Sequence, residues 1–187
     1  MPDPSQSNIL INLMKLWQKI KYHQDLYSPV ELWKRGRVVL ICFPELYQER
    51  EAAEHTVRSI VEACPQKRFC VLSTKALPER WLNVELLRLR KEDLNLFSLP
   101  NPAFIRYLRD KKIDTVIDLW STFNLANACL SRRCGADLRV CFGTEHAPAF
   151  YNLLVVPGAP EQSLLRQYQA MADTILNLER SEAKRAD

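Results

Sequence analysis

The stretch Arg37-Val38-Val39-Leu40-Ile41-Cys42-Phe43, which Pro44 ends, decides the fold class of this 187-residue chain. Its centre is a continuous apolar run without polar residues at alternate positions. Such a run is typical of a strand that is covered on both faces, as in a parallel sheet. We therefore expect a parallel strand here, with helices on either side of the sheet.

Strand-like and helix-like segments alternate along the rest of the chain. Further strands are predicted at 69–72, 84–90, 94–97, 115–119 and 138–142. Helical spacing of apolar residues is found at 49–64, 101–112, 124–134 and 161–179. Because this alternation favours βαβ units, we predict an α/β fold. The expected architecture is a single Rossmann-like domain with a mainly parallel sheet, helices on both faces, and extra N-terminal and C-terminal helices.

The first 36 residues precede the alternating pattern. Residues 7–27 have helical spacing, and we expect Pro29 to break that pattern before the first strand. We favour a helix that packs onto its own domain, and the alternative is a helix that contacts a membrane or a partner. The predicted organisation is a helical extension at 1–36, a Rossmann-like domain at 37–180 and a tail at 181–187.

Charge and composition restrict the partners and the location of the protein. The net charge of +4 and the pI near 8.8 suit an anionic ligand but are too weak to indicate nucleic acid. The sequence has neither a secretory signal pattern nor an apolar stretch long enough to span a membrane. The six cysteines lie mostly in apolar strand or helix patterns, as reduced, buried thiols do. We expect a cytoplasmic protein, with the inner face of the membrane as a place of weak peripheral contact.

The common cofactor and metal motifs are missing. The turn after the first strand, Pro44-Glu45-Leu46-Tyr47, contains no glycine, so a dinucleotide fingerprint or a Walker loop is not expected there. Cys129, Cys134 and Cys141 precede His146, but their spacing lacks the Cys-x2-Cys pair of common zinc sites. We therefore expect no cofactor and no metal.

Ligands of open α/β sheets bind beyond the carboxyl ends of the strands. This rule selects the loops that follow the strands ending near residues 43, 72, 119 and 142. We take as catalytic candidates Glu45, Asp118 and His146, and as ligand-binding candidates Ser73, Thr74, Lys75, Ser121, Thr144 and Glu145. For Asp118, proton transfer and capping of the next segment are equally good interpretations. For His146, proton transfer with Glu145 competes with a simple turn position, which we favour.

Two segments in the second half carry a family resemblance. These are Lys112-Ile113-Asp114-Thr115-Val116-Ile117-Asp118-Leu119 and, after a short helix, Cys134-Gly135-Ala136-Asp137-Leu138-Arg139-Val140-Cys141-Phe142-Gly143. Together they resemble the N-terminal domain of glycosyltransferase family 9, the heptosyltransferase-like enzymes of lipopolysaccharide assembly. Tyr151-Asn152-Leu153-Leu154-Val155 and the closing helix follow in the family's order, so the resemblance covers roughly residues 37–180.

The resemblance implies a GT-B architecture, in which two Rossmann-like halves face each other across a cleft. In that architecture the N-terminal half holds the acceptor and a catalytic carboxylate, and the C-terminal half holds the nucleotide-sugar donor. The family has a Gly-Asp in the loop after its first strand, where this chain has Phe43-Pro44-Glu45-Leu46-Tyr47-Gln48-Glu49. Glu45 and Glu49 are the available substitutes. The sequence ends where the donor half would begin.

These departures lead us to expect a non-catalytic or degenerate glycosyltransferase-like module that acts in ligand binding or as a scaffold. Its expected partners are a nucleotide-sugar or phosphosugar ligand and a protein partner or second copy of the chain. One alternative is a glycosyltransferase subunit that a separate donor domain completes. Another is a peripheral protein that contacts a membrane or partner through its N-terminal helix.

Overall fold

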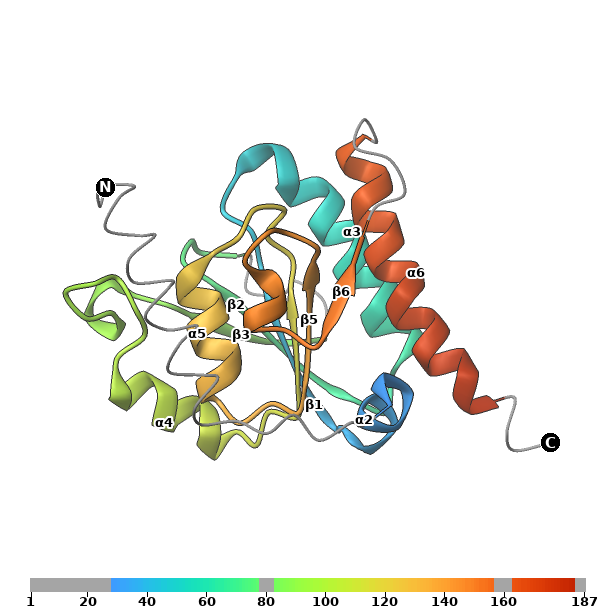
Figure 1. The fold of residues 1–187 in the computed structure, drawn as a ribbon, viewed down its shortest axis with the longest axis horizontal. Helices are drawn as coiled ribbons and strands as arrows, with labels where there is room; N and C mark the ends of the chain where they lie inside the picture. The colour runs from blue at the N-terminus through green and yellow to red at the C-terminus, as the bar shows by residue number, and fades with distance from the viewer. Residues whose placement is uncertain (1–27, 78–82, 157–162, 184–187) are drawn as a thin grey trace.

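The computed structural model describes residues 28–77, 83–156 and 163–183. These residues form a six-stranded, all-parallel sheet in the order β3-β2-β1-β4-β5-β6 (Figure 1). The strands are β1 (Val38–Cys42), β2 (Arg68–Ser73), β3 (Glu85–Arg88), β4 (Thr115–Asp118), β5 (Leu138–Phe142) and β6 (Leu153–Val155). The described helices are α2 (Pro29–Arg35), α3 (Tyr47–Ala63), α4 (Pro102–Asp110), α5 (Leu125–Arg133) and α6 (Leu164–Ala183). The predicted Rossmann-like α/β fold is thus confirmed, whereas the helix expected at 7–27 lies outside the described residues.

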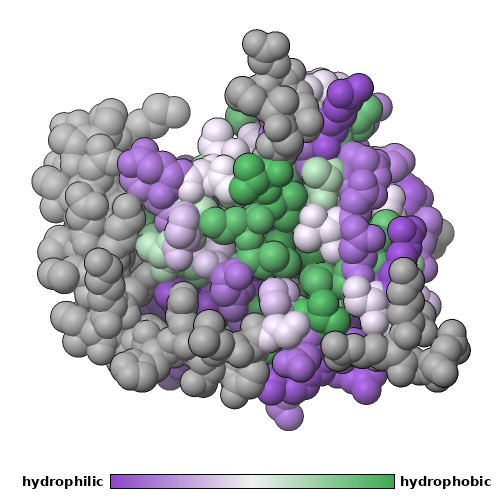
Figure 2. Space-filling view, turned by 45° about the vertical axis from the view of Figure 1, so that its right-hand side comes forward, coloured by the Kyte–Doolittle hydropathy of each residue, from purple (hydrophilic) through white to green (hydrophobic). Residues whose placement is uncertain are grey.

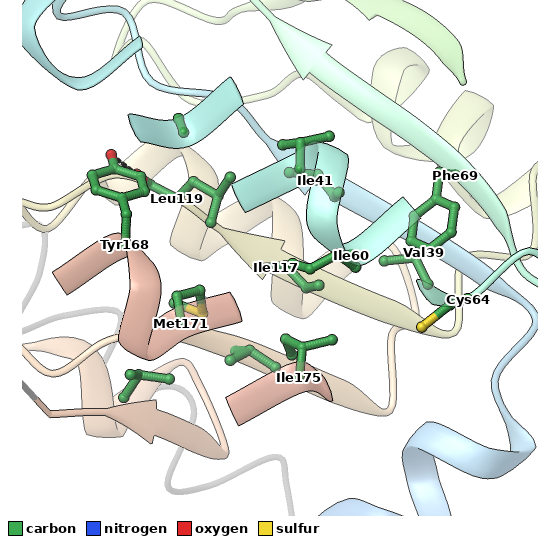
Figure 3. Packing of buried hydrophobic residues seen from close by; sticks show 14 of the residues in the cluster. Val39, Ile41, Ile60, Cys64, Phe69, Ile117, Leu119, Tyr168, Met171 and Ile175 are labelled. Carbon is green, nitrogen blue, oxygen red and sulfur yellow. Dashed lines mark hydrogen bonds between the residues drawn. The ribbon is translucent and has the colours of Figure 1, made fainter. Parts of the chain in front are cut away.

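Helices α2, α3 and α6 cover one face of the sheet. The apolar side chains of that face point from β1, β2, β4 and β5 into one buried cluster with α3 and α6. Figure 3 shows its centre, where Ile41 and Ile117 of the sheet pack in one cluster with Ile60 of α3 and Met171 of α6. Tyr168 of α6 is also buried there and donates its hydroxyl hydrogen bond to the carbonyl of Leu119. This contact fixes α6 to the end of β4.

Helices α4 and α5 cover the opposite face. Alternate residues of β1, such as Leu40, pack there against Phe104 and Leu108 of α4 and Leu130 of α5. Both helices begin at an asparagine whose side-chain oxygen accepts the backbone N–H three residues later, as N-caps do. Because both faces are covered, the strands need continuous apolar sequences, as the first strand indicated.

Helix α2, which Pro29 begins, is not among the helices that the sequence predicts. The helical pattern that Pro29 is expected to break, at 7–27, lies outside the described residues. Proline suits the first turn of a helix, where its missing N–H would have no intrahelical partner. The last carbonyls of α2 are bound by the buried Lys67, whose Nζ lies 2.7 Å from the carbonyl oxygens of both Trp33 and Gly36. The indole N–H of Trp33 donates to Glu179 of α6 at 2.6 Å. These contacts fasten α2 against α6 and the start of β2.

The strand predicted at 94–97 does not form. A single antiparallel bridge joins Leu94 and Pro100, and the chain between them makes a tight reversal. The apolar spacing there comes from a hairpin arm whose tip faces solvent. Two short 3-10 turns complete the described structure, η1 (Lys91–Asp93) before this hairpin and η2 (Ala147–Ala149) before β6.

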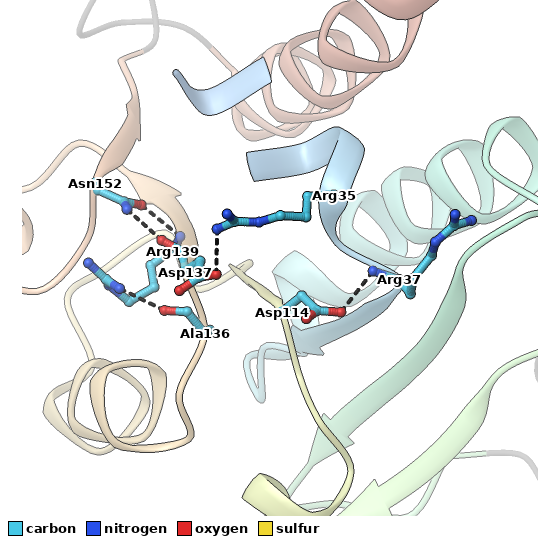
Figure 4. Close-up of polar contacts among 7 residues, drawn as sticks. All are labelled: Arg35, Arg37, Asp114, Ala136, Asp137, Arg139 and Asn152. Atoms are coloured by element: carbon cyan, nitrogen blue, oxygen red, sulfur yellow. Dashed lines mark hydrogen bonds and ion pairs between the residues drawn. The ribbon is translucent and has the colours of Figure 1, made fainter. Parts of the chain in front are cut away.

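Polar contacts fix the amino ends of the strands to one another (Figure 4). Asp114 accepts the backbone N–H groups of Arg37 and Val38, which begin β1. The side chain of Asn152 binds the N–H of Arg139 and the carbonyl of Asp137, at 2.7 Å each, and so holds β6 against β5. Sequence patterns missed β6 as a separate strand because it has only three residues.

Strand β6 forms one edge of the sheet, and Leu153 and Leu154 on it are only partly buried. Figure 2 brings the side with α6 forward and shows apolar side chains gathered there between hydrophilic ones. Val156 and Leu165 follow β6 and begin α6, and both are largely exposed. None of the described helices combines the length and the apolar character needed to cross a membrane.

Candidate functional site

Strand order brings the predicted loops to one edge of the sheet. Strands β2, β1, β4 and β5 are neighbours and run parallel, so the loops after them lie side by side at the carboxyl edge. The chain goes from β1 to β2 on one side and returns to β4 on the other. The β1–β4 boundary is therefore the switch point at which ligands of such sheets bind.

Asp118, the last residue of β4, is buried at this edge, with a relative exposure of only 3%. The hydroxyl of Tyr151 donates to its Oδ2 at 2.6 Å. The side-chain amide of Asn127 and the backbone N–H of Trp120 donate to its Oδ1 at 3.0 and 3.2 Å. Three donors thus hold the carboxylate from α5, from the loop after β4 and from the segment before β6.

Burial makes the ionised form of Asp118 costly. Desolvation raises the pKa of its carboxyl group from 3.8 to about 6, while the hydrogen bonds from Tyr151, Trp120 and Asn127 partly offset that rise. The charge of Glu49 adds a smaller upward contribution to this pKa. A carboxyl group that titrates near neutrality could exchange protons, but this one is enclosed by its partners.

Very little space adjoins Asp118. The cavity that it lines with Tyr151 and Thr144 offers about 10 Å³ to the centre of a water molecule, which is room for about one water. The buried hydroxyl of Thr144 has no hydrogen-bond partner among the described residues. A sugar or a nucleotide cannot enter this cavity without movement of the surrounding loops.

A second buried acid, Glu49, lies beside the switch point on α3. Its carboxylate accepts the hydroxyl hydrogen bond of Ser121 from the loop after β4, and its exposure is 4%. The sequence offers Glu49 as a substitute for the family's aspartate but does not single it out as a site residue. Its spacing gave a usable signal, because Ala52 and Ala53 follow at i+3 and i+4 on the buried face of the same helix.

The loops after β1 and β2 contact each other. Glu45 accepts the hydroxyl hydrogen bond of Thr74, and its backbone carbonyl accepts Lys75 Nζ at 3.1 Å. The hydroxyl of the buried Ser73 accepts the backbone N–H of Lys75 at 3.2 Å. The structure therefore brings Glu45, Ser73, Thr74 and Lys75 together, although the Glu45 carboxylate already has a partner.

His146 and Glu145 do not form a close acid–base pair. His146 Nδ1 lies 4.0 Å from the Glu145 carboxylate, which is 90% exposed. The ring of His146 packs edge-on against Phe123, with 5.5 Å between the ring centroids. This packing agrees with the turn interpretation of His146, since the histidine precedes η2.

An open pocket lies at the β1 and β2 side of the same edge. It has a volume of about 380 Å³, within the usual range for small-ligand sites. Its lining consists of Phe43, Tyr47, Gln48, Arg50, Glu51, Glu54 and Leu77. The guanidinium of Arg50 has no hydrogen-bond or ion-pair partner within the described part of the chain, and Tyr47 is 87% exposed. The pocket thus combines an available cation with an aromatic face.

The cysteines lie in different parts of the buried core. All six cysteines are free and buried. Over residues 28–77, 83–156 and 163–183, no group of three or more His, Cys, Asp or Glu side chains is arranged to hold a metal ion. Cys134 belongs to the α4–α5 side of the core, while Cys141 packs with Phe150 and Tyr151 in a separate cluster.

Comparison with known proteins adds no family assignment. Neither the scan against protein-family models nor the search of curated proteins gives a match to this chain.

Proposed function

We propose that this chain is a glycosyltransferase-like binding module that has no catalytic base of its own. The observation that carries the proposal is the state of the acids at the carboxyl edge. Asp118 is enclosed by three donors, Glu49 is bound to Ser121, and Glu45 is bound to Thr74. A general base must reach the proton that it abstracts. The enclosed acids Asp118 and Glu49 are engaged by groups of the chain itself.

The proposed ligand is a phosphosugar or a nucleotide-sugar, and the proposed site is the pocket between α3 and the ends of β1 and β2. Arg50 supplies a cation for phosphate oxygens, and the exposed ring of Tyr47 supplies a face for an apolar sugar or base surface. Gln48 and Glu51 add groups that hydrogen-bond hydroxyls. The amino end of α3, with Tyr47 as its first residue, adds a favourable dipole for the anion.

The test is a thermal-shift panel of sugar phosphates, nucleotide-sugars and free nucleotides on the full chain. A ligand that binds only the folded protein raises its melting temperature by mass action. We expect a concentration-dependent rise that Arg50→Gln abolishes. Arg180→Gln, an exposed arginine in the last turn of α6, serves as the control and should keep the rise. A flat panel, or a rise that survives Arg50→Gln, contradicts the proposed site.

A second candidate, a working glycosyltransferase subunit, is favoured by the pKa of Asp118 near 6. In that case Tyr151 must leave the carboxylate before an acceptor can approach. Sugar transfer by the chain mixed with a donor-domain protein, lost in Asp118→Asn, would favour this candidate. The same transfer activity would contradict the binding-module proposal.

A further inference from the structure

A small hairpin between β3 and α4 exposes two large apolar side chains to solvent. Leu96 is fully exposed and Phe97 is 63% exposed. In Figure 1 the yellow-green segment before α4 lies at the left-hand extremity of the domain, away from the core. Single exposed apolar residues are ordinary on protein surfaces, but two neighbours at a protruding tip indicate a contact surface.

Successive hydrogen bonds hold this hairpin in shape. At its base, the N–H of Asn101 donates to the carbonyl of Asp93 at 2.8 Å. Above it, Leu94 and Pro100 form a bridge, and the N–H of Asn95 donates to the carbonyl of Leu99 at 2.8 Å. These three contacts join the two arms of the hairpin from its base to its tip.

The side chain of Asn95 organises the tip itself. Its Oδ1 accepts the backbone N–H groups of Phe97 and Leu99 at 2.9 and 3.1 Å. Ser98 adopts a φ of +57°, a conformation that non-glycine residues adopt only when the surroundings impose it. The tip is therefore preorganised, so little conformational entropy is lost when Leu96 and Phe97 enter a partner surface.

Cationic side chains surround the base of the hairpin. Arg88, Arg90, Lys91 and Arg106 are all exposed there, on β3, the following turn and α4. Of the nearby acids, Glu92 pairs with Arg90, and Asp93 accepts the backbone N–H of Arg90. The guanidiniums of Arg88 and Arg106 have no hydrogen-bond or ion-pair partner in the described part of the chain. The surface therefore presents an apolar tip above available positive charge.

A pocket of about 510 Å³ lies under the hairpin, between β3 and α4. Its polar lining consists of Arg88, Arg90, Glu92 and Asp93, of which Arg90 and Glu92 pair with each other. Leu86, Phe104 and Tyr107 are among the residues that complete the lining. A lipid phosphate group fits beside Arg88, because its oxygens can bind that guanidinium while its glycerol and upper acyl carbons contact the apolar side chains.

We infer that the Leu96–Phe97 hairpin and the arginine-lined pocket beneath it form a docking site for an anionic phospholipid surface. Leu96 and Phe97 enter the boundary between headgroups and acyl chains, and Arg88 and Arg106 face the lipid phosphates. This combination resembles the two-part signal, apolar insertion plus basic charge, that peripheral membrane binding requires. A protein pocket would suit the apolar tip alone and would leave the surrounding cations unexplained.

Flotation of the full chain with vesicles tests this site. We expect binding to phosphatidylcholine vesicles that contain phosphatidylglycerol and at least tenfold weaker binding to phosphatidylcholine alone. Leu96→Ser with Phe97→Ser should reduce partitioning at least tenfold, and Arg88→Gln should reduce it about fivefold. Leu165→Ser removes an exposed leucine from α6 instead and should have no effect.

The tip variants should fold normally, because both side chains are exposed; their melting temperatures provide the check. Glycerol phosphate in excess should not compete, since the site needs a lipid surface rather than free phosphate. Binding that is unchanged in the double variant would overturn the inference. So would an absence of vesicle binding, competition by glycerol phosphate, or equal binding to neutral and anionic vesicles.

Discussion

The variant Asp118→Asn should flatten the dependence of stability on pH. Desolvation raises the pKa of the buried Asp118 carboxyl group to about 6, from an ordinary value of 3.8. The folded protein thus holds this proton more tightly than the unfolded chain does. The resulting contribution to stability is fully present below about pH 4 and is lost as the pH rises through about 6. Each pKa unit corresponds to about 1.4 kcal/mol, so the whole change amounts to about 3 kcal/mol.

Asparagine has nearly the shape of aspartate but does not titrate, so it removes this contribution. We expect the free energy of unfolding of Asp118→Asn, relative to the wild type, to increase by about 3 kcal/mol between about pH 4 and pH 7. The hydroxyl of Tyr151 does not titrate in this range, because burial raises its pKa well above 10. Equilibrium urea unfolding at closely spaced pH values measures this difference in the free energy of unfolding.

The matched control for this experiment is Asp110→Asn at the exposed end of α4. Its stability curve should run parallel to that of the wild type. If the Asp118→Asn curve is parallel as well, the carboxyl group does not carry a raised pKa in the folded protein, and the reasoning from its burial fails. A ¹³C titration of the Asp118 carboxyl carbon, with a midpoint near 6 expected, measures the same property directly.

Two further outcomes follow from buried groups. Lys67→Met should lower the free energy of unfolding by about 2–4 kcal/mol, because it leaves the carbonyls of Trp33 and Gly36 without their 2.7 Å partner. Lys34→Met, on the helix α2 that Lys67 caps, should change the free energy of unfolding by less than about 0.5 kcal/mol in the same denaturant titration. Equal losses would refute the capping role. All six thiols should resist alkylation by iodoacetamide at neutral pH until the protein unfolds, because they are buried and burial raises their pKa, that of Cys70 to about 11. Rapid labelling of the folded chain, followed by mass spectrometry, would show that these thiols are accessible.

The sheet was predictable from the sequence because the residues of each buried strand are themselves mostly apolar. The run Val38–Cys42 is apolar throughout, and covered parallel strands require such a run on both faces. The same holds for the longer helices, whose inward stripe repeats every three or four residues. Helix α2 was missed because proline both ends helices and begins them, and the helix has only seven residues. The contact of Lys67 with the end of α2, on which the Lys67→Met prediction rests, comes from a distant part of the chain.

The hairpin at 94–100 shows why a strand cannot be predicted from hydrophobicity alone. Leu94, Leu96 and Phe97 look like part of a short strand when only hydrophobicity is considered. What decides the conformation is the side chain of Asn95, which takes the N–H groups of Phe97 and Leu99 and so competes with strand pairing. An asparagine between apolar residues was thus the available signal for a turn.

The position of the candidate site could be predicted, but its chemistry could not. Strand order follows from the βαβ pattern, and it carries the loops after β1, β2, β4 and β5 to one edge. Which acids are free at that edge depends on contacts between distant residues. Asp118 meets Tyr151 33 positions later, and Glu49 meets Ser121 72 positions later. No local sequence pattern predicts contacts between residues so far apart in the chain.

The two halves of the carboxyl edge differ in a way that separates the proposals experimentally. At β4 and β5, Asp118 and its three donors leave room for about one water. At β1 and β2, the pocket with Arg50 is open, and the lipid-docking hairpin follows β3 on that same side of the sheet. Asp118→Asn should therefore alter stability without altering either the ligand-induced thermal shift or vesicle binding. Arg50→Gln should affect only the thermal shift, and the Leu96 and Phe97 variants only the vesicle binding. If Asp118→Asn abolishes ligand binding while the fold is intact, the enclosed carboxylate belongs to the ligand site, and the binding-module proposal gives way to the catalytic one.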